Sequence, residues 1–342
     1  MDIKFFWKDI IAKCEKLGKK IVPAGKTSTS YKIYCDRGQE DLKQKDELRK
    51  AKWNATKKFF DLDDDDDTFN LFKQAATGLE LQRITQLNSS SLFAFLFFHS
   101  VAKNGVKIKG KGFEHTGKFT HVTFEVNNTI QVTNRPISHI DVVLSNEKIA
   151  LLLECKFSEY LEHYSRSSEK ASMEAYGAFY HALVNNGGVN GLKIDESTDT
   201  KNKRWITLKG DGKKPCYVGG LKQTIAHFMG AHGILNNGPN HNELNLEDKE
   251  LHLAEVVFDF SSFTSLADEE HRKVGDALKS YKELHNSLCE KLAQIDVPDR
   301  RKVTVHTELL SYQNNFELEL PRTFADLYRL PNLANAYPCQ VQ

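Results

Sequence analysis

The chain of 342 residues is long enough for one large domain, or for a core with two modest additions. Its 47 basic and 46 acidic residues give a formal net charge of +1, so net charge does not indicate a nucleic-acid ligand. The six cysteines include no Cys-x-x-Cys pair, which argues against a zinc site and a disulfide framework. The sequence contains no apolar membrane span and no signal-peptide core, so we expect a cytoplasmic protein with no membrane partner.

The N-terminal region is basic and ends in an acidic run. Residues 1–60 contain 16 Lys and Arg against 8 Asp and Glu. Such a region can contact the phosphate backbone of a nucleic acid, but a lysine-rich solvated surface is the commoner explanation. The run from Asp61 to Asp67 lacks the central glycine and terminal glutamate of an EF-hand loop. We interpret residues 1–67 as a basic N-terminal region with an acidic linker that begins a helix.

Residues 69–102 are expected to be helical, with an interruption at residues 88–91. That interruption, Asn-Ser-Ser-Ser, consists of residues that cap helices, so it can end one helix and begin the next. Residues 92–98 are apolar on nearly every side and should be buried.

Three strands are expected next. Residues 120–126 alternate between apolar and polar side chains, as a half-buried strand does. Residues 139–144 and 148–157 form two further strands, joined by a polar turn at residues 145–147. The apolar run in the last strand is typical of a strand buried on both faces. The three segments predict an antiparallel meander.

Charged side chains at the end of this meander predict a site. Because side chains alternate along a strand, Glu154 and Lys156 should share a face that Asp141 can reach from the neighbouring strand. Two carboxylates can bind a divalent cation such as Mg²⁺, and a lysine beside the attacking water suits phosphodiester hydrolysis. The simpler alternative is an ion pair between Glu154 and Lys156, with Asp141 capping the hairpin. We prefer the catalytic interpretation because both charged groups follow alternating or apolar strand segments joined by a tight turn, and because buried charges must be paired or bind metals.

The spacing of these residues resembles a known active-site motif. Asp141, twelve residues, and then Glu154-Cys155-Lys156 resemble the motif of the PD-(D/E)XK, or restriction-endonuclease-like, nuclease superfamily. Ile140 stands where the motif has proline, a position that varies in the superfamily. Over residues 68–260 the chain resembles bacterial restriction endonucleases. The resemblance implies an α/β fold with a central mixed sheet flanked by helices.

Further site residues are implied by the resemblance alone. A helix before the sheet often supplies an additional carboxylate to the metal site, and Glu80 is the candidate, although a helix-surface glutamate is equally consistent. Many members carry a glutamine on a helix after the E-x-K strand, and Gln223 matches that position. The Cys155 carbonyl oxygen is a candidate further metal ligand.

The interval after the E-x-K strand divides into a helix and a basic segment. Residues 160–185 are expected to be helical, and residues 201–214 are expected to form a loop, where the superfamily commonly inserts DNA-contacting elements. Lysines and an arginine around Trp205 suit contacts with the DNA backbone, although a solvated loop anchored by tryptophan fits as well. The candidate DNA contacts are Lys203, Arg204, Lys213 and Lys214.

The C-terminal part should complete the sheet and add a long helix. We expect strands at residues 251–260 and 303–310 and a helix at residues 267–295. This helix has a heptad-like apolar stripe, which packs most often against the chain's own body and otherwise forms a dimer interface. We therefore expect residues 68–265 to form the nuclease core and residues 266–342 a C-terminal extension.

Together these observations predict a Mg²⁺-dependent endonuclease that cuts double-stranded DNA. A Type II-like restriction enzyme would act as a homodimer, since two strands need two sites, and would be paired with a cognate methyltransferase. A structure-dependent repair nuclease or an exonuclease is an alternative with the same chemistry. A non-catalytic DNA-binding module is a third class, which the intact Asp-Glu-Lys set argues against.

Overall fold

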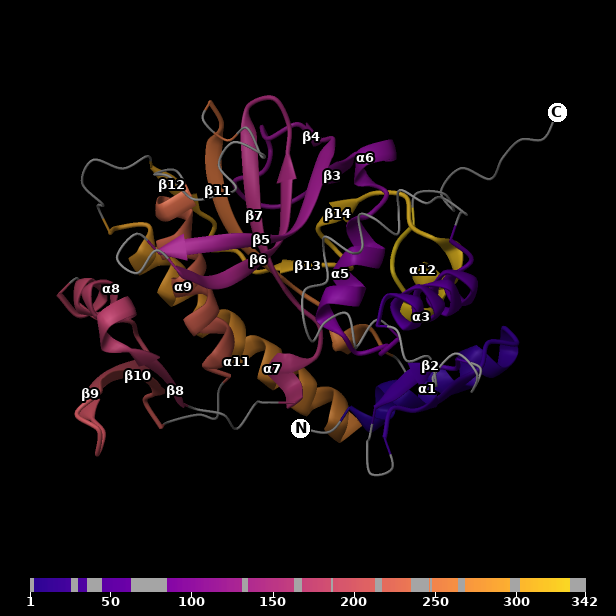
Figure 1. Cartoon of the computed structure of the whole chain (residues 1–342), viewed down its shortest axis with the longest axis horizontal. Coiled ribbons are helices and arrows are strands. Elements are labelled where there is room, and N and C mark those ends of the chain that lie inside the picture. Colours follow the sequence, from indigo (N-terminus) through magenta and orange to yellow (C-terminus); the bar gives the residue numbers. More distant parts are fainter. Residues whose placement is uncertain are drawn as a thin grey trace.

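The protein is a mixed α/β structure with a central mixed sheet flanked by helices (Figure 1). The computed structural model describes residues 3–25, 30–35, 45–62, 85–130, 135–162, 168–185, 187–212, 217–234, 246, 248–263, 268–295 and 302–332.

The central sheet contains the predicted antiparallel meander. Its strands run in the order β12-β11-β7-β6-β5, and β13 also pairs with β11. Strands β5, β6 and β7 are antiparallel neighbours, whereas β11 lies parallel to β7. The bounds are β5 (His121–Ile130), β6 (Arg135–Ser145), β7 (Ile149–Lys156), β11 (Glu250–Val257), β12 (Val303–Val305) and β13 (Leu310–Ser311). The strand predicted at 303–310 is therefore two short strands.

The turn between β6 and β7 is held by Asn146. Its side-chain oxygen accepts hydrogen bonds from the backbone N–H groups of Lys148 and Ile149, each at 2.9 Å. This is the local hydrogen bonding that favours asparagine in tight turns. Every residue of β7 is buried, as its apolar run predicts.

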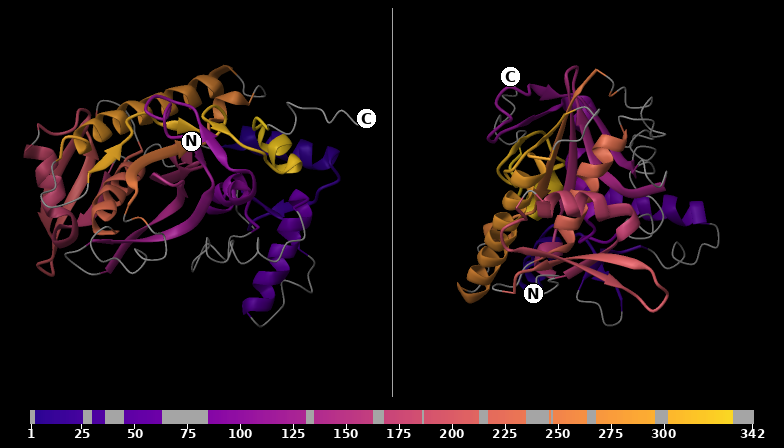
Figure 2. Two further views of the ribbon diagram at one scale, coloured as in Figure 1. Left: turned by 90° about the horizontal axis from the view of Figure 1, so that it is seen from above. Right: turned by 90° about the vertical axis from the view of Figure 1, so that its left-hand side faces the viewer.

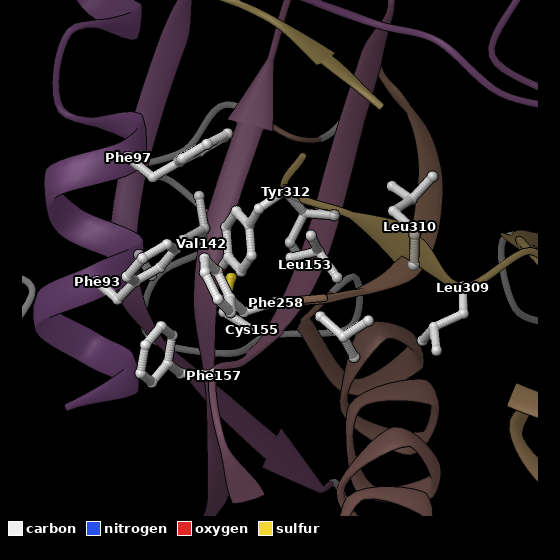
Figure 3. Packing of buried hydrophobic residues seen from close by; sticks show 14 of the residues in the cluster. Phe93, Phe97, Val142, Leu153, Cys155, Phe157, Phe258, Leu309, Leu310 and Tyr312 are labelled. Carbon is white, nitrogen blue, oxygen red and sulfur yellow. The ribbon is translucent and has the colours of Figure 1, made fainter. Parts of the chain in front are cut away.

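One face of the sheet packs against helix α5 (Ser90–Phe98). The Ser89 hydroxyl accepts the backbone N–H of Leu92 at 3.3 Å, so the predicted serine cap begins this helix. Figure 3 shows Phe93 of α5 on the same side of the sheet as Cys155 and Tyr312. Residues 92–98 are all buried, as expected.

The other face of the sheet is covered by α9 (Gly219–Ile234), which contacts β5, β6, β7 and β11. Helix α11 (Asp268–Leu292) contacts α9 and α7 (Glu159–Glu162) and lies along one side of the molecule (Figure 2). Its apolar stripe is buried within the chain, so the stripe packs against the protein's own body and is not a dimer interface. The buried stripe residues are Val274, Ala277, Tyr281, Leu284, Leu288 and Leu292.

Two expectations for the interval between β7 and α9 are wrong. The segment predicted as one helix contains β8 (Ser168–Ser172) followed by α8 (Met173–Asn185), and the predicted basic loop contains β10 (Arg204–Gly210). With β9 (Leu192–Thr198) they form a separate antiparallel sheet in the order β8-β10-β9, and α8 contacts both β8 and β10. In Figure 1 this sheet lies at one end of the molecule. We refer to it as the small sheet.

The N-terminal residues form α1 (Lys4–Lys16), the strand pair β1 (Ile21–Pro23) and β2 (Tyr31–Ile33), and α3 (Lys45–Phe60). Helix α1 packs on α12 (Arg322–Tyr328), near the other end of the described chain. The remaining elements are α6 (Val101–Asn104), the three-stranded sheet β14-β3-β4 and a 3₁₀ turn at Phe260–Ser262. The strands of this three-stranded sheet are β3 (Val106–Ile108), β4 (Lys118–Phe119) and β14 (Phe316–Glu317). No described helix combines the length and apolar composition needed to cross a membrane.

Candidate active site

The Asp-Glu-Lys set comes together on β6 and β7. The paired register places Val142 opposite Leu153, and its continuation by one residue places Asp141 opposite Glu154. Glu154 and Lys156 are only 1% and 4% exposed. Alternation along β7 turns both toward α9, while Cys155 lies on the opposite, apolar face (Figure 3).

Side chains of α9 complete the polar cluster. The Lys156 ammonium donates to Glu154 Oε1 and, at 2.6 Å, to the Gln223 carbonyl oxygen. The His227 ring contacts the other Glu154 oxygen through Nε2. Gln223 and His227 lie four residues apart, so both project from one side of the helix. The Glu154 carboxylate is thus held between two basic side chains.

The charges of this cluster stabilise one another. Burial by itself would raise the pKa of Glu154, but Lys156 and His227 lower it to about 2. Burial by itself would lower the pKa of Lys156, but the neighbouring Glu154 carboxylate raises it well above its usual value. Both effects favour the carboxylate and the ammonium, the forms that a buried ion pair needs.

Asp141 is in a different electrostatic environment. Its Oδ2 accepts the backbone N–H of Cys155 at 2.7 Å. Burial and the nearby Glu154 carboxylate raise the pKa of Asp141 well above its usual value. Two carboxylates at this end of the sheet therefore repel each other, and a bound cation would relieve that repulsion.

These donors fit Mg²⁺, which commonly takes one or two protein carboxylates and keeps several waters. Asp141 and Glu154 would supply the carboxylates, and the Cys155 carbonyl oxygen is a further donor on the same strand. Within the described ranges, no group of three or more His, Cys, Asp or Glu side chains is arranged to hold a metal ion. The predicted extra carboxylate, Glu80, lies outside the described residues.

Two residues near this cluster were missed by sequence reasoning. His227 shares a helix face with Gln223, a spacing visible in the sequence, but its contact with Glu154 depends on where α9 packs. Glu125 on β5 contributes to the raised pKa of Asp141. Its backbone φ is 48°, an uncommon value for a residue with a side chain. No sequence signal marks this backbone conformation.

A second buried carboxylate holds α9 and α11 against the sheet. Glu255 on β11 lies in register with Glu154 and is 1% exposed. Thr224 of α9 donates to it at 2.9 Å, and Tyr281 of α11 donates at 2.5 Å. The His285 ring lies 3.5 Å from the same carboxylate. Since Thr224 is next to Gln223, these contacts fix the helix that supplies the site.

The predicted DNA contacts are only partly described. Lys203 lies over the Trp205 ring, with its ammonium 4.4 Å from the ring centroid. Arg204 forms an ion pair with Glu196 at 3.2 Å. Lys213 and Lys214 lie outside the described residues.

Comparison of the chain with protein-family models, with curated proteins and with solved structures finds no match.

Proposed function

We propose that this protein is a Mg²⁺-dependent nuclease of the PD-(D/E)XK type that hydrolyses phosphodiester bonds of double-stranded DNA. The observation that carries the proposal is the convergence of Asp141, Glu154, Lys156 and Gln223 at one end of the central sheet. These four residues come from three separate elements, β6, β7 and α9, and all four are residues that the resemblance to the superfamily implies.

The order of elements also supports a restriction-endonuclease-like core. Helix α5 precedes a three-stranded meander that carries the acid on its second strand and E-x-K on its third. A later helix then brings a glutamine to the lysine. This is the order that the resemblance implies.

In this proposal Asp141 and Glu154 would hold the metal ion. Bound Mg²⁺ would supply Lewis-acid stabilisation of the charge on the scissile phosphate. The raised pKa of Lys156 keeps it protonated, so its ammonium would orient the attacking water and offset charge on the pentacovalent phosphorus. This electrostatic role fits Lys156 better than that of a general base. Gln223 would keep the ammonium in place by accepting a hydrogen bond from it through the side-chain carbonyl oxygen.

The test is a cleavage assay with plasmid DNA and Mg²⁺, run beside a thermal melt and a DNA-binding measurement. Asp141→Ala and Glu154→Ala should abolish cleavage, because each removes charge that would hold the metal, while DNA binding persists. Lys156→Ala should lower the rate by roughly 10²–10⁴-fold. Gln223→Ala should lower cleavage more than it lowers the melting temperature.

Glu147→Ala is the matched control, since Glu147 is an exposed glutamate in the turn between β6 and β7. It should cut like the wild type. Wild-type cleavage by a folded Glu154→Ala protein would show that this site is not the nuclease centre.

The products decide between the biological roles. Discrete fragments would indicate a Type II-like restriction endonuclease, with a homodimeric enzyme and a cognate methyltransferase as the accompanying proposals. A smear, or degradation from ends, would indicate a repair nuclease or an exonuclease. A cytoplasmic setting belongs to the same proposal, because none of the four described cysteines forms a disulfide.

A further inference from the structure

The small sheet has one apolar and one polar face. Alternation along β10 places Ile206 and Leu208 on one side, and both are fully buried. The register places Ala171 of β8 and Ile194 of β9 on this same side. Because α8 contacts β8 and β10, this face is the one packed against the protein.

The opposite face of the small sheet carries lysines around a tryptophan. The register aligns Lys170 of β8 with Thr207 of β10, and Lys193 of β9 with Lys209 of β10. Trp205 lies on the same face, two residues before Thr207, and Lys203 lies over its ring. We call Lys170, Lys193, Lys203, Trp205 and Lys209 the lysine face.

The lysine face is accessible and carries net positive charge. Lys170, Lys193 and Lys203 are exposed, and the Lys209 side chain is 45% exposed. Two aspartates offset part of the charge, since Asp195 pairs with Lys209 at 2.6 Å and Asp199 accepts the Trp205 indole N–H at 3.1 Å.

The structure separates the two DNA contacts predicted from neighbouring positions. Lys203 belongs to the lysine face. Arg204 is on the opposite side of β10, where it pairs with Glu196. The pairing of Glu196 with His181 of α8 at 2.7 Å confirms that this side faces α8.

The small sheet is also attached to the candidate active site. The Lys222 ammonium donates to the backbone carbonyl of Lys170 at 2.9 Å. Lys222 precedes Gln223, whose side chain contacts Lys156. One turn of α9 therefore links the strand that carries Lys170 to the cluster around Glu154.

We propose that the lysine face of the small sheet binds the phosphate backbone of duplex DNA and holds the substrate beside the active site. This inference rests on the proposed nuclease function and extends it by naming the contact surface. Lysines on a regular sheet suit a backbone ligand because they supply charge without reading bases. The partly buried Trp205 gives this surface a rigid centre.

The experiment measures binding of a fluorescein-labelled DNA duplex by anisotropy with Ca²⁺ in place of Mg²⁺, over a range of salt concentrations. The double variant Lys170→Gln/Lys193→Gln should weaken binding by roughly ten-fold or more at 0.1 M salt and reduce the slope of log Kd against log salt by about 2. Lys103→Gln, at an exposed lysine on α6, should bind like the wild type. Thermal melts of all variants verify folding.

Equal affinity of the double variant and the wild type for the DNA duplex would overturn the proposal. The result is separable from nuclease activity. If the double variant loses binding but the wild type does not cut with Mg²⁺, the lysine face stands and the nuclease proposal fails. If the wild type cuts and the double variant binds and cuts equally well, the nuclease stands and the lysine face does not.

Discussion

Glu154 shows how a charged residue is accommodated inside this protein. A carboxylate that is 1% exposed would be costly without partners, and here Lys156 and His227 each contact one of its oxygens. Removing Lys156 would leave the buried Glu154 carboxylate without its cationic partner. Activity and stability are therefore coupled at this position, which is why every cleavage assay on the cluster needs a melting curve beside it.

A buried histidine pair predicts a loss of stability in acid. His252 Nδ1 and His306 Nε2 are 2.8 Å apart, and Phe113 stacks on the His306 ring. Burial, and then the neighbouring His252, lower the pKa of His306 from 6.5 to about 4. Glu114 acts in the opposite direction, and Glu250 lies 3.7 Å from His252. The folded protein therefore binds this proton only well below the pH at which the unfolded chain does.

Between pH 6.5 and 4 the unfolded chain binds more protons, so the free energy of unfolding should fall as the pH falls through this range. The contribution of His306 is on the order of 2–3 kcal/mol. Urea denaturation at several pH values should show a smaller decrease for His306→Asn than for the wild type. His115→Asn, at an exposed histidine, is the control. An unchanged pH dependence in His306→Asn would refute the assignment.

At the scale of elements, α9 is the helix on which the candidate site depends. Gln223, Thr224 and His227 contact Lys156, Glu255 and Glu154, respectively, so three side chains of one helix reach two neighbouring strands. Tyr281 of α11 contacts Glu255 as well, which ties the second helix to the same strand end. The position of α9 is thus set by buried polar contacts in addition to apolar packing.

A charged substitution in the buried apolar stripe of α11 should destabilise the fold and should not change the oligomeric state. Leu288 is fully buried inside the chain, so Leu288→Lys would bury a charge with no partner. We expect a loss of about 3 kcal/mol or more in the free energy of unfolding, seen as a lower melting temperature. Asp276→Lys, at an exposed position of the same helix, should melt like the wild type. A stable Leu288→Lys protein that changes only from dimer to monomer would contradict this packing.

At the scale of the whole molecule, an aromatic cluster joins the N-terminal helix to the end of the E-x-K strand. The Phe6 ring centroid lies 5.6 Å from that of Phe157, which directly follows β7, and 5.2 Å from that of Phe260. Tyr328 of α12 stacks on Phe6 at 6.1 Å. Residues from both ends of the described chain therefore pack beside the segment that carries Glu154 and Lys156.

Phe6→Ala should consequently destabilise the protein by about 3–5 kcal/mol, as expected for removal of a buried ring. Chemical denaturation followed by fluorescence measures the loss. Leu17→Ala removes a side chain that is 44% exposed and should have little effect. If Phe6→Ala were as mild as Leu17→Ala, the N-terminal helix would not share the core that supports the site.

The local sequence pattern was sufficient to predict the central strands of this protein. The apolar run of β7, the tight turn at Asn146 and the alternation at Glu154, Cys155 and Lys156 are set by neighbours in the chain, so the meander and the shared face were predictable. The stripe of α11 was likewise visible in its spacing, although only packing decided that it faces the chain's own body.

Tertiary structure decided what the local pattern left open. Residues 168–172 have no marked strand pattern and become β8 because β10 offers them a hydrogen-bonding edge, which is why a single helix over residues 160–185 was a wrong expectation. The contact of His227 with Glu154 and the register of Glu255 beside Glu154 both join residues that are distant in sequence. Lys203 and Arg204 are neighbours in sequence but lie on opposite faces of the small sheet. Sequence spacing determines which side chains share a face of a strand or helix. The packing of α9 and the strand pairing of the small sheet determine which other residues each of these faces contacts.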